Sequence, residues 1–124
     1  MKVRLLLALS IFLSMSLFSS AARLSVGDFA PAVTGTTDQG ESLALGDVYG
    51  AQEYTLVYFY PKADTPGCTA QGCSLRDAYE TLLDKGVAVI GVSIDSVEDQ
   101  KAFKAKYHLP FPLIADLDKK VVKA

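Results

Sequence analysis

Two cysteines, Cys68 and Cys73, are the residues of this 124-residue chain for which chemistry can be argued. Thr65 suits the capping position of a helix and Pro66 is favoured at the first helical position, so Cys68 falls at the third. A side chain there faces unpaired backbone N–H groups and the positive end of the helix dipole. Because those groups stabilise a thiolate, the position predicts that Cys68 is a nucleophile at neutral pH.

The five-residue spacing of the two cysteines indicates what kind of pair they form. On an ideal helix it separates the two Cα atoms by roughly 8.6 Å, whereas a disulfide tolerates at most about 7 Å without backbone movement. A bridge therefore requires the helix start to unwind, which favours a redox pair over the alternative, a static structural disulfide. A C-x-x-C motif is absent, and two cysteines with the single His108 cannot complete the four-ligand shell of a zinc site.

The elements that must position these cysteines alternate between strand and helix. Residues 55–60 are a β-branched and aromatic run closed by Pro61, which predicts a buried strand. Residues 66–85 place apolar side chains on one face and end at Gly86, which predicts a helix. Residues 87–94 predict a second buried strand.

The rest of the chain continues this pattern. A helix capped by Ser96 is predicted to run to about residue 108, a third short strand over 113–115, and a further helical turn over 118–124. Residues 23–53 are rich in turn formers and predict a hairpin or loop region. Alternating strands and helices imply βαβ units and a mostly parallel sheet flanked by helices. The predicted fold class is therefore α/β.

Residues 1–22 have the layout of a secretory signal peptide. Lys2 and Arg4 precede a leucine-rich run over residues 5–18, and small residues follow. The run has 14 residues with three serines, and a spanning helix needs roughly 20 apolar residues. We therefore expect a signal peptide over 1–22, a single domain over 23–124, and a secreted or periplasmic location. An uncleaved leader that anchors the protein in the membrane is the alternative.

Charge and size limit the partners of the remaining domain. Removing 22 of the 124 residues leaves 102, and the formal net charge changes from −2 to −4 because Lys2 and Arg4 leave. An acidic domain has no basic surface for nucleic acid, which is therefore not an expected partner. The length allows one compact domain and not two. We expect a monomer with no stable membrane association after cleavage of the leader.

The segment YFYPKADTPGCTAQGCSLRD carries a specific resemblance. Pro61, Thr65 and Cys68 stand in P-x-x-x-T-x-x-C spacing, which resembles the active-site motif of the peroxiredoxins. The placement of Cys73, together with GVSIDS and FPLIAD further along, resembles the bacterioferritin-comigratory, or peroxiredoxin Q, subfamily. The similarity extends from Gly27 to the last residue.

The resemblance implies a thioredoxin-like fold and a thiol-dependent peroxidase reaction. By this carry-over, Cys68 is the peroxidatic thiolate that attacks hydrogen peroxide or an alkyl hydroperoxide and becomes a sulfenic acid. Thr65 hydrogen-bonds the peroxide and the thiolate, and Pro61 shields the site from water. Cys73 is the resolving thiol, and the intramolecular disulfide is recycled by thioredoxin or a similar thiol reductant. No metal, haem or flavin cofactor is implied.

One departure from the family pattern concerns an arginine that completes the peroxide site in later strands. This chain stops before that region, so its C-terminal elements are expected to be missing, and Arg76 is expected to be an ion-pairing residue. Two alternatives to the peroxidase therefore stay open. One is a thioredoxin-like thiol–disulfide oxidoreductase acting on proteins, and the other is an inactive truncated fragment. Turn or capping roles are expected for Asp95, Asp116 and His108.

Overall fold

The computed structural model describes residues 23–124, and the predicted signal peptide lies outside the described residues. The elements run in the order β1 (Thr34–Thr36), β2 (Ser42–Ala44), α1 (Leu45–Ala51), β3 (Tyr54–Phe59), α2 (Pro66–Asp77), α3 (Tyr79–Asp84), β4 (Val87–Ser93), α4 (Val97–Tyr107), β5 (Leu113–Ala115) and α5 (Lys120–Lys123). Within residues 23–124, no helix is long and apolar enough to cross a membrane.

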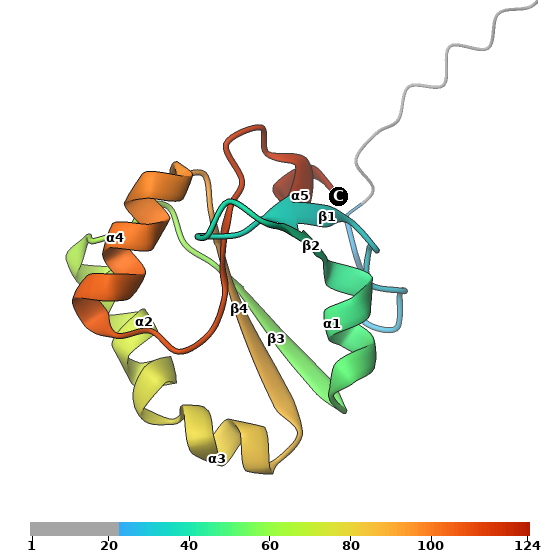
Figure 1. The fold of residues 1–124 in the computed structure, drawn as a ribbon. Coiled ribbons are helices and arrows are strands. Elements are labelled where there is room, and N and C mark those ends of the chain that lie inside the picture. Colours follow the sequence, from blue (N-terminus) through green and yellow to red (C-terminus); the bar gives the residue numbers. More distant parts are fainter. Residues whose placement is uncertain (1–22) are drawn as a thin grey trace, which may run out of the picture.

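A three-stranded parallel sheet in the order β3-β4-β5 forms the centre of the molecule (Figure 1). Its central strand β4 pairs with β3 from Tyr54↔Val87 to Phe59↔Val92. Strands β1 and β2 form an antiparallel hairpin, which adjoins the sheet through a bridge from Thr37 to Ile114. The predicted α/β class, the parallel sheet and the N-terminal hairpin are confirmed.

Side-chain alternation along the strands divides the core into two layers. Helices α2, α3 and α4 cover one face of the sheet, and α1 and α5 lie on the other (Figure 1). The first layer consists of Tyr58, Tyr60, Ala63, Cys68, Val89, Phe103, Leu109, Phe111 and Leu113. The second consists of Leu45, Ile90, Val92, Ile114 and Val121. One of the two cysteines therefore belongs to the hydrophobic core.

The single helix predicted over residues 66–85 is wrong in its middle, because the chain turns at Ala78 and forms α2 and α3 instead. The N–H of Ala78 donates to the carbonyls of Ser74 and Arg76, which closes α2 with a tight final turn. After the turn, the Tyr79 ring packs edge-on against Phe111 at 5.7 Å between centroids. Tertiary packing of this aromatic pair thus accompanies a break that local helix periodicity does not reveal.

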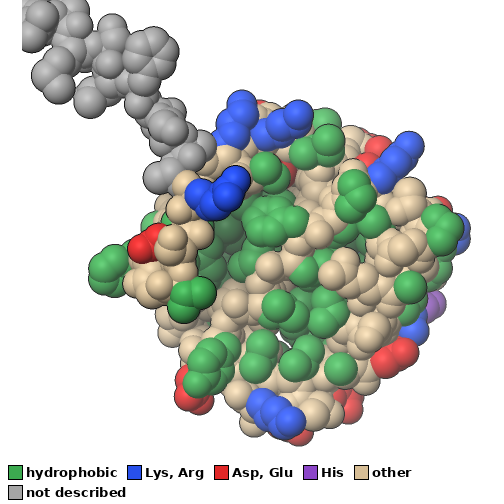
Figure 2. Space-filling view, turned by 180° about the vertical axis from the view of Figure 1, so that it is seen from behind, with side chains coloured by type: hydrophobic (Ala, Val, Ile, Leu, Met, Phe, Trp, Pro, Cys, Tyr) green, Lys and Arg blue, Asp and Glu red, His purple; other side chains and the backbone are tan. Residues whose placement is uncertain are grey.

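One edge of the sheet carries exposed apolar side chains. In the described residues β3 pairs only with β4, and Tyr54, Leu56 and Phe59 along it are 60%, 38% and 55% exposed. Figure 2 shows the molecule from the side opposite to Figure 1, and hydrophobic side chains gather on this face as well. A groove with a cavity volume of about 600 Å³ runs between Phe59 of β3 and Val122 of α5.

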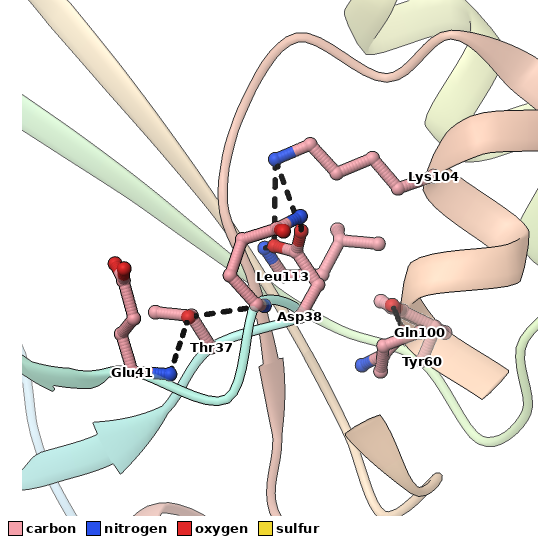
Figure 3. Close-up of polar contacts among 8 residues, drawn as sticks. Thr37, Asp38, Glu41, Tyr60, Gln100, Lys104 and Leu113 are labelled. Atoms are coloured by element: carbon pink, nitrogen blue, oxygen red, sulfur yellow. Dashed lines mark hydrogen bonds and ion pairs between the residues drawn. The ribbon is translucent and has the colours of Figure 1, made fainter. Parts of the chain in front are cut away.

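A buried carboxylate ties the hairpin to both the sheet and α4 (Figure 3). Asp38 is 1% exposed, and its Oδ1 accepts a hydrogen bond of 3.0 Å from the N–H of Leu113. The ammonium of Lys104 pairs with the same carboxylate at 3.4 Å. Because a buried charge needs such partners, this contact fixes α4 relative to the end of the hairpin. Helix α4 in turn packs beside the cysteines.

Candidate active site

Cys68 lies in the first turn of α2, at the predicted third helical position. The helix begins at Pro66 with Thr65 in the capping position, as predicted. The Cys68 side chain is 7% exposed and packs in the first core layer. Beside it, a Cβ added to Gly67 would meet no atom within 4 Å, so the space next to the helix start is open.

Thr65 occupies the capping position without making the capping hydrogen bond. Its hydroxyl donates to the carbonyl of Lys62 at 2.9 Å, and no side chain caps α2. The Thr65 carbonyl accepts the first helical hydrogen bond, from the N–H of Thr69 at 2.8 Å. The N–H groups of the first turn are therefore without a side-chain acceptor. Such donors are available to an anion at the helix start.

Cys73 lies on the same uninterrupted helix as Cys68. It is half-buried, and both cysteines are free thiols. Gly72 beside it is buried, and a Cβ there would come within 3.5 Å of Leu109, so this part of α2 packs closely on the core. Because the helix runs unbroken between the two cysteines, they can bond only if the turn that separates them unwinds.

Arg76 is an ion-pairing residue, as expected. Its Nε lies 2.9 Å from Asp77, and this carboxylate, the largest influence, raises the pKa of Arg76. Its second contact is long-range, since the guanidinium donates to the carbonyl of Tyr107 at 2.7 Å. The Cys73 side chain is a further neighbour. Arg76 therefore links the end of α2 to the end of α4.

The loop between β3 and α2, which carries Pro61 and Thr65, is held by a buried polar chain. The N–H of Ala63 donates to Oδ2 of Asp95 at 2.7 Å, and the Ser93 hydroxyl donates to the same oxygen at 2.6 Å. Gln100 donates from Nε2 to Ser93 Oγ at 2.9 Å. Its Oε1 accepts the hydroxyl of Tyr60, the residue that precedes the loop (Figure 3).

A second anchor holds the same loop from the outside. Asp64 adopts a positive φ of 59°, and its carboxylate accepts hydrogen bonds from Lys106 at 2.8 Å and from the Tyr107 hydroxyl at 2.6 Å. The Lys106 ammonium, and then the Tyr107 hydroxyl, lower the pKa of Asp64. The last turn of α4 thus contacts the loop before Cys68 and, through Arg76, the helix after Cys73.

Two tyrosines from the end of β3 share the first core layer with Cys68. The rings of Tyr58 and Tyr60 stack at 5.4 Å between centroids, and Phe111 meets Tyr58 edge-on at 5.9 Å. Burial, which is the largest cause, raises the pKa of both tyrosines. Both hydroxyls therefore keep their protons at neutral pH and are hydrogen-bond donors.

The four predicted site residues lie in one stretch of the chain, with Pro61 exposed on the loop, Thr65 at the helix cap and the two cysteines on α2. The capping roles expected for Asp116 and His108 are observed. Asp116 accepts the N–H groups of Val121 and Val122 at 2.9 Å each at the start of α5, and His108 ends α4.

Sequence reasoning missed that Asp95 and Gln100 hold the loop. The available signal for Asp95 was its place at the carboxyl end of a strand, where α/β folds build their sites. Gln100 gave no such signal, because it lies inside a helix 40 residues from its partner Tyr60. Among residues 23–124, no group of three or more His, Cys, Asp or Glu side chains could hold a metal ion.

Comparisons with known proteins show which family the sequence resembles. The sequence model of the AhpC/TSA family matches residues 26–124. A protein of Coxiella burnetii, named a candidate peroxiredoxin bcp, is 48% identical over 98 residues, covering 79% of this chain and 64% of that protein. Peroxiredoxin Bcp of Bacillus subtilis is 41% identical over 101 residues, covering 82% of this chain and 63% of that protein.

The fold is also similar to solved structures. The bacterioferritin comigratory protein of Xanthomonas campestris, whose structures were solved to explain its alkyl peroxide reduction activity, superposes with a TM-score of 0.71 at 31% identity. The match covers 77% of this chain and 62% of that one. The chain thus spans somewhat less than two thirds of the length of these similar proteins.

Proposed function

Because the chain belongs to the AhpC/TSA family, and within it to the Bcp and peroxiredoxin Q group, we propose that it is a thiol-dependent peroxidase that reduces hydrogen peroxide or alkyl hydroperoxides. One observation carries the proposal. Two free cysteines lie five residues apart on a helix whose start has no side-chain cap, and the first of them is buried beside a loop anchored at Ala63 and Asp64.

The first step uses Cys68. Its thiolate attacks one oxygen of the peroxide, the O–O bond breaks, and the leaving alkoxide or hydroxide takes up a proton to become an alcohol or water. The sulfur is oxidised to a sulfenic acid. The uncapped N–H groups of α2 stabilise the thiolate before attack. Thr65 and Pro61, on the anchored loop beside it, would orient the peroxide and limit the access of water.

The second step uses Cys73. After α2 unwinds between the two cysteines, the Cys73 thiolate attacks the Cys68 sulfur and the S–O bond breaks. Hydroxide leaves and is protonated to water, and a disulfide joins the two residues. An external dithiol reductant, such as a thioredoxin-like protein, then supplies two electrons and two protons that restore both thiols. The reaction requires no metal or organic cofactor.

The experiment is peroxide consumption by the purified chain with dithiothreitol as reductant, with Cys68→Ser and Cys73→Ser as variants. We expect Cys68→Ser to be inactive. Cys73→Ser should react with the first peroxide at the wild-type rate. The Cys68 sulfenic acid that results cannot form an intramolecular disulfide. If both variants fail equally in a single turnover, the assignment of roles is wrong. A chain that reduces insulin disulfides and ignores peroxide would be a thiol–disulfide oxidoreductase instead.

A non-cooperative thermal transition of residues 23–124, followed by circular dichroism, would support the inactive-fragment alternative. A cooperative one would show that these residues fold on their own, and the peroxide assay then decides whether they are active.

We also propose that residues 1–22 direct the protein to a secreted or periplasmic location and are then removed, leaving a monomer without membrane attachment. The support is the order of basic, apolar and small residues in the sequence. The mass of the exported protein tests the cleavage, and light scattering of that product tests the monomer. Retention of the leader in a membrane fraction would favour an anchored protein.

A further inference from the structure

Three buried side-chain hydroxyls of the described residues have no hydrogen-bond partner, those of Thr55, Tyr58 and Thr69. Thr69 follows Cys68 on α2, and Tyr58 belongs to the same core layer as Cys68. Thr55 points to the opposite face of β3, since side chains alternate along a strand. An unpaired buried hydroxyl destabilises the conformation that contains it. The unpaired hydroxyls of Tyr58 and Thr69 therefore destabilise the conformation in which the turn between the cysteines is helical.

The Tyr58 side chain packs in the same core layer as Cys68, and both cysteines influence its pKa. Burial, and then charges on Tyr60, Cys68 and Cys73, raise the pKa of Tyr58, so the hydroxyl remains protonated. By contrast, only Cys68 of the two cysteines influences the pKa of Tyr60, and the Tyr60 hydroxyl already donates to Gln100. Of the unpaired hydroxyls near the cysteines, Thr69 lies on α2 itself, so Tyr58 is the one that reaches them from another element, β3.

Tyr58 cannot turn to find a partner elsewhere. Its ring stacks on Tyr60 and contacts the edge of Phe111. It also lies across Gly91, where an added Cβ would be only 2.9 Å from the hydroxyl oxygen. A partner must therefore come to the hydroxyl. The neighbouring segment that has to move is the turn of α2 between Cys68 and Cys73, because the disulfide cannot form on an intact helix.

We propose that the Tyr58 hydroxyl gains its hydrogen-bond acceptor only when this turn unwinds, and that Tyr58 is therefore a positioning residue for disulfide formation. Unwinding releases backbone carbonyls of the turn and the Cys73 sulfur, all of which can accept from a hydroxyl. The hydroxyl thus favours the conformation in which Cys73 reaches Cys68. This inference rests on the proposed function, in which the two cysteines form a redox pair.

The first test measures how the sulfenic acid of Cys68 divides between two fates. Either the Cys73 thiolate attacks the Cys68 sulfur, hydroxide leaves and is protonated to water, and the disulfide forms, or the sulfenic acid attacks a second peroxide, whose O–O bond breaks, to give a sulfinic acid. In Tyr58→Phe the disulfide should form about fivefold more slowly, the effect of one neutral hydrogen bond on a rate. The sulfinic fraction, measured by mass spectrometry, should rise accordingly while the rate of the first oxidation is unchanged.

The matched control is Thr55→Val, which removes an unpaired buried hydroxyl from the opposite face of the same strand. It should leave the division between disulfide and sulfinic acid as in the wild type. Thr69→Val removes the second unpaired hydroxyl at the turn and should shift the division in the same direction as Tyr58→Phe. It also serves as the test if Tyr58→Phe does not fold. Equal sulfinic fractions in all four proteins would overturn the proposal.

The second test does not involve peroxide. In a glutathione redox buffer, Tyr58→Phe should shift the equilibrium between dithiol and disulfide about fivefold towards the dithiol, because the reduced form no longer contains the unpaired hydroxyl. Thr55→Val should cause no shift. If the wild-type chain does not react with peroxide, the proposed function fails and this equilibrium still tests Tyr58. An unchanged equilibrium in Tyr58→Phe overturns the role of Tyr58 whatever the peroxidase assay gives.

Discussion

Replacing Gln100 by methionine tests whether the buried polar chain holds the loop before Cys68. Gln100 is fully buried, and it accepts from the Tyr60 hydroxyl and donates to Ser93 Oγ and to the Ile114 carbonyl at 2.8 Å. Methionine has a similar length and flexible shape but none of these hydrogen bonds. The Tyr60 hydroxyl, itself 5% exposed, would then be buried without an acceptor.

The size of the effect follows from these contacts. A newly unpaired buried hydroxyl costs about 1 to 3 kcal/mol, and the other two lost hydrogen bonds contribute about 0.5 to 1 kcal/mol each. We therefore expect Gln100→Met to lower the free energy of unfolding by about 2 to 5 kcal/mol. In a domain of roughly 100 residues each kcal/mol changes Tm by about 4 to 8 °C, so Tm should fall by at least about 8 °C.

A double-mutant cycle separates the hydrogen bond from a general packing defect. Tyr60→Phe removes the hydroxyl that Gln100→Met leaves unpaired, so the double variant should be more stable than the sum of the two single effects predicts. We expect a coupling of at least about 1 kcal/mol, measured by urea unfolding of the reduced protein. Additive effects, within about 0.5 kcal/mol, would refute the account of a shared buried hydrogen bond.

Three further variants test other contacts of the site. Asp95→Ala should slow oxidation of Cys68 several-fold in stopped-flow measurements because the Ala63 N–H loses its acceptor, and Asp95→Asn, which keeps a carbonyl oxygen there, should restore most of the rate. Gly91→Ala should destabilise the fold by about 1 to 3 kcal/mol in a thermal melt, because the new Cβ would lie 2.9 Å from the Tyr58 hydroxyl oxygen. The pKa of Asp64 is lowered from 3.8 in the folded state, so the stability due to its contact with Lys106 is fully present above pH 3.8 and lost as the pH falls through the lowered value. Asp64→Asn should therefore flatten the acid side of a plot of Tm against pH, and an unchanged acid side would show that this contact adds nothing.

The order of the elements and the placement of the cysteines could be predicted because both depend on local patterns. The run over residues 55–60 and the Thr65–Pro66 helix start are short-range signals, and the structure places both within a residue of the predicted positions. Local patterns do not report whether a hydroxyl accepts from the N–H groups of a helix start or donates to a nearby carbonyl. The Thr65 side chain turns to Lys62 instead of capping α2.

The contacts that fix the site geometry could not be predicted because they join distant segments. Tyr60 and Gln100 are 40 residues apart in the sequence, and Ala63 of the loop is 32 residues from Asp95. The turn at Ala78 has the same origin, since it accompanies a contact between Tyr79 and Phe111. These partners meet only because the folded sheet places the end of a strand beside a helix that is distant in the sequence.

The outer edge of β3 has a consequence for how the chain behaves in concentrated solution. Among the described residues this strand pairs on one side only, and Leu56 in its middle is 38% exposed. A flat apolar strand with free N–H and C=O groups is a template for adding another strand, and many natural proteins protect such edges with a lysine. None of the residues of β3 is charged. We therefore expect the protein, proposed above to be a monomer in dilute solution, to self-associate only at high concentration, and Leu56→Lys to keep it monomeric there.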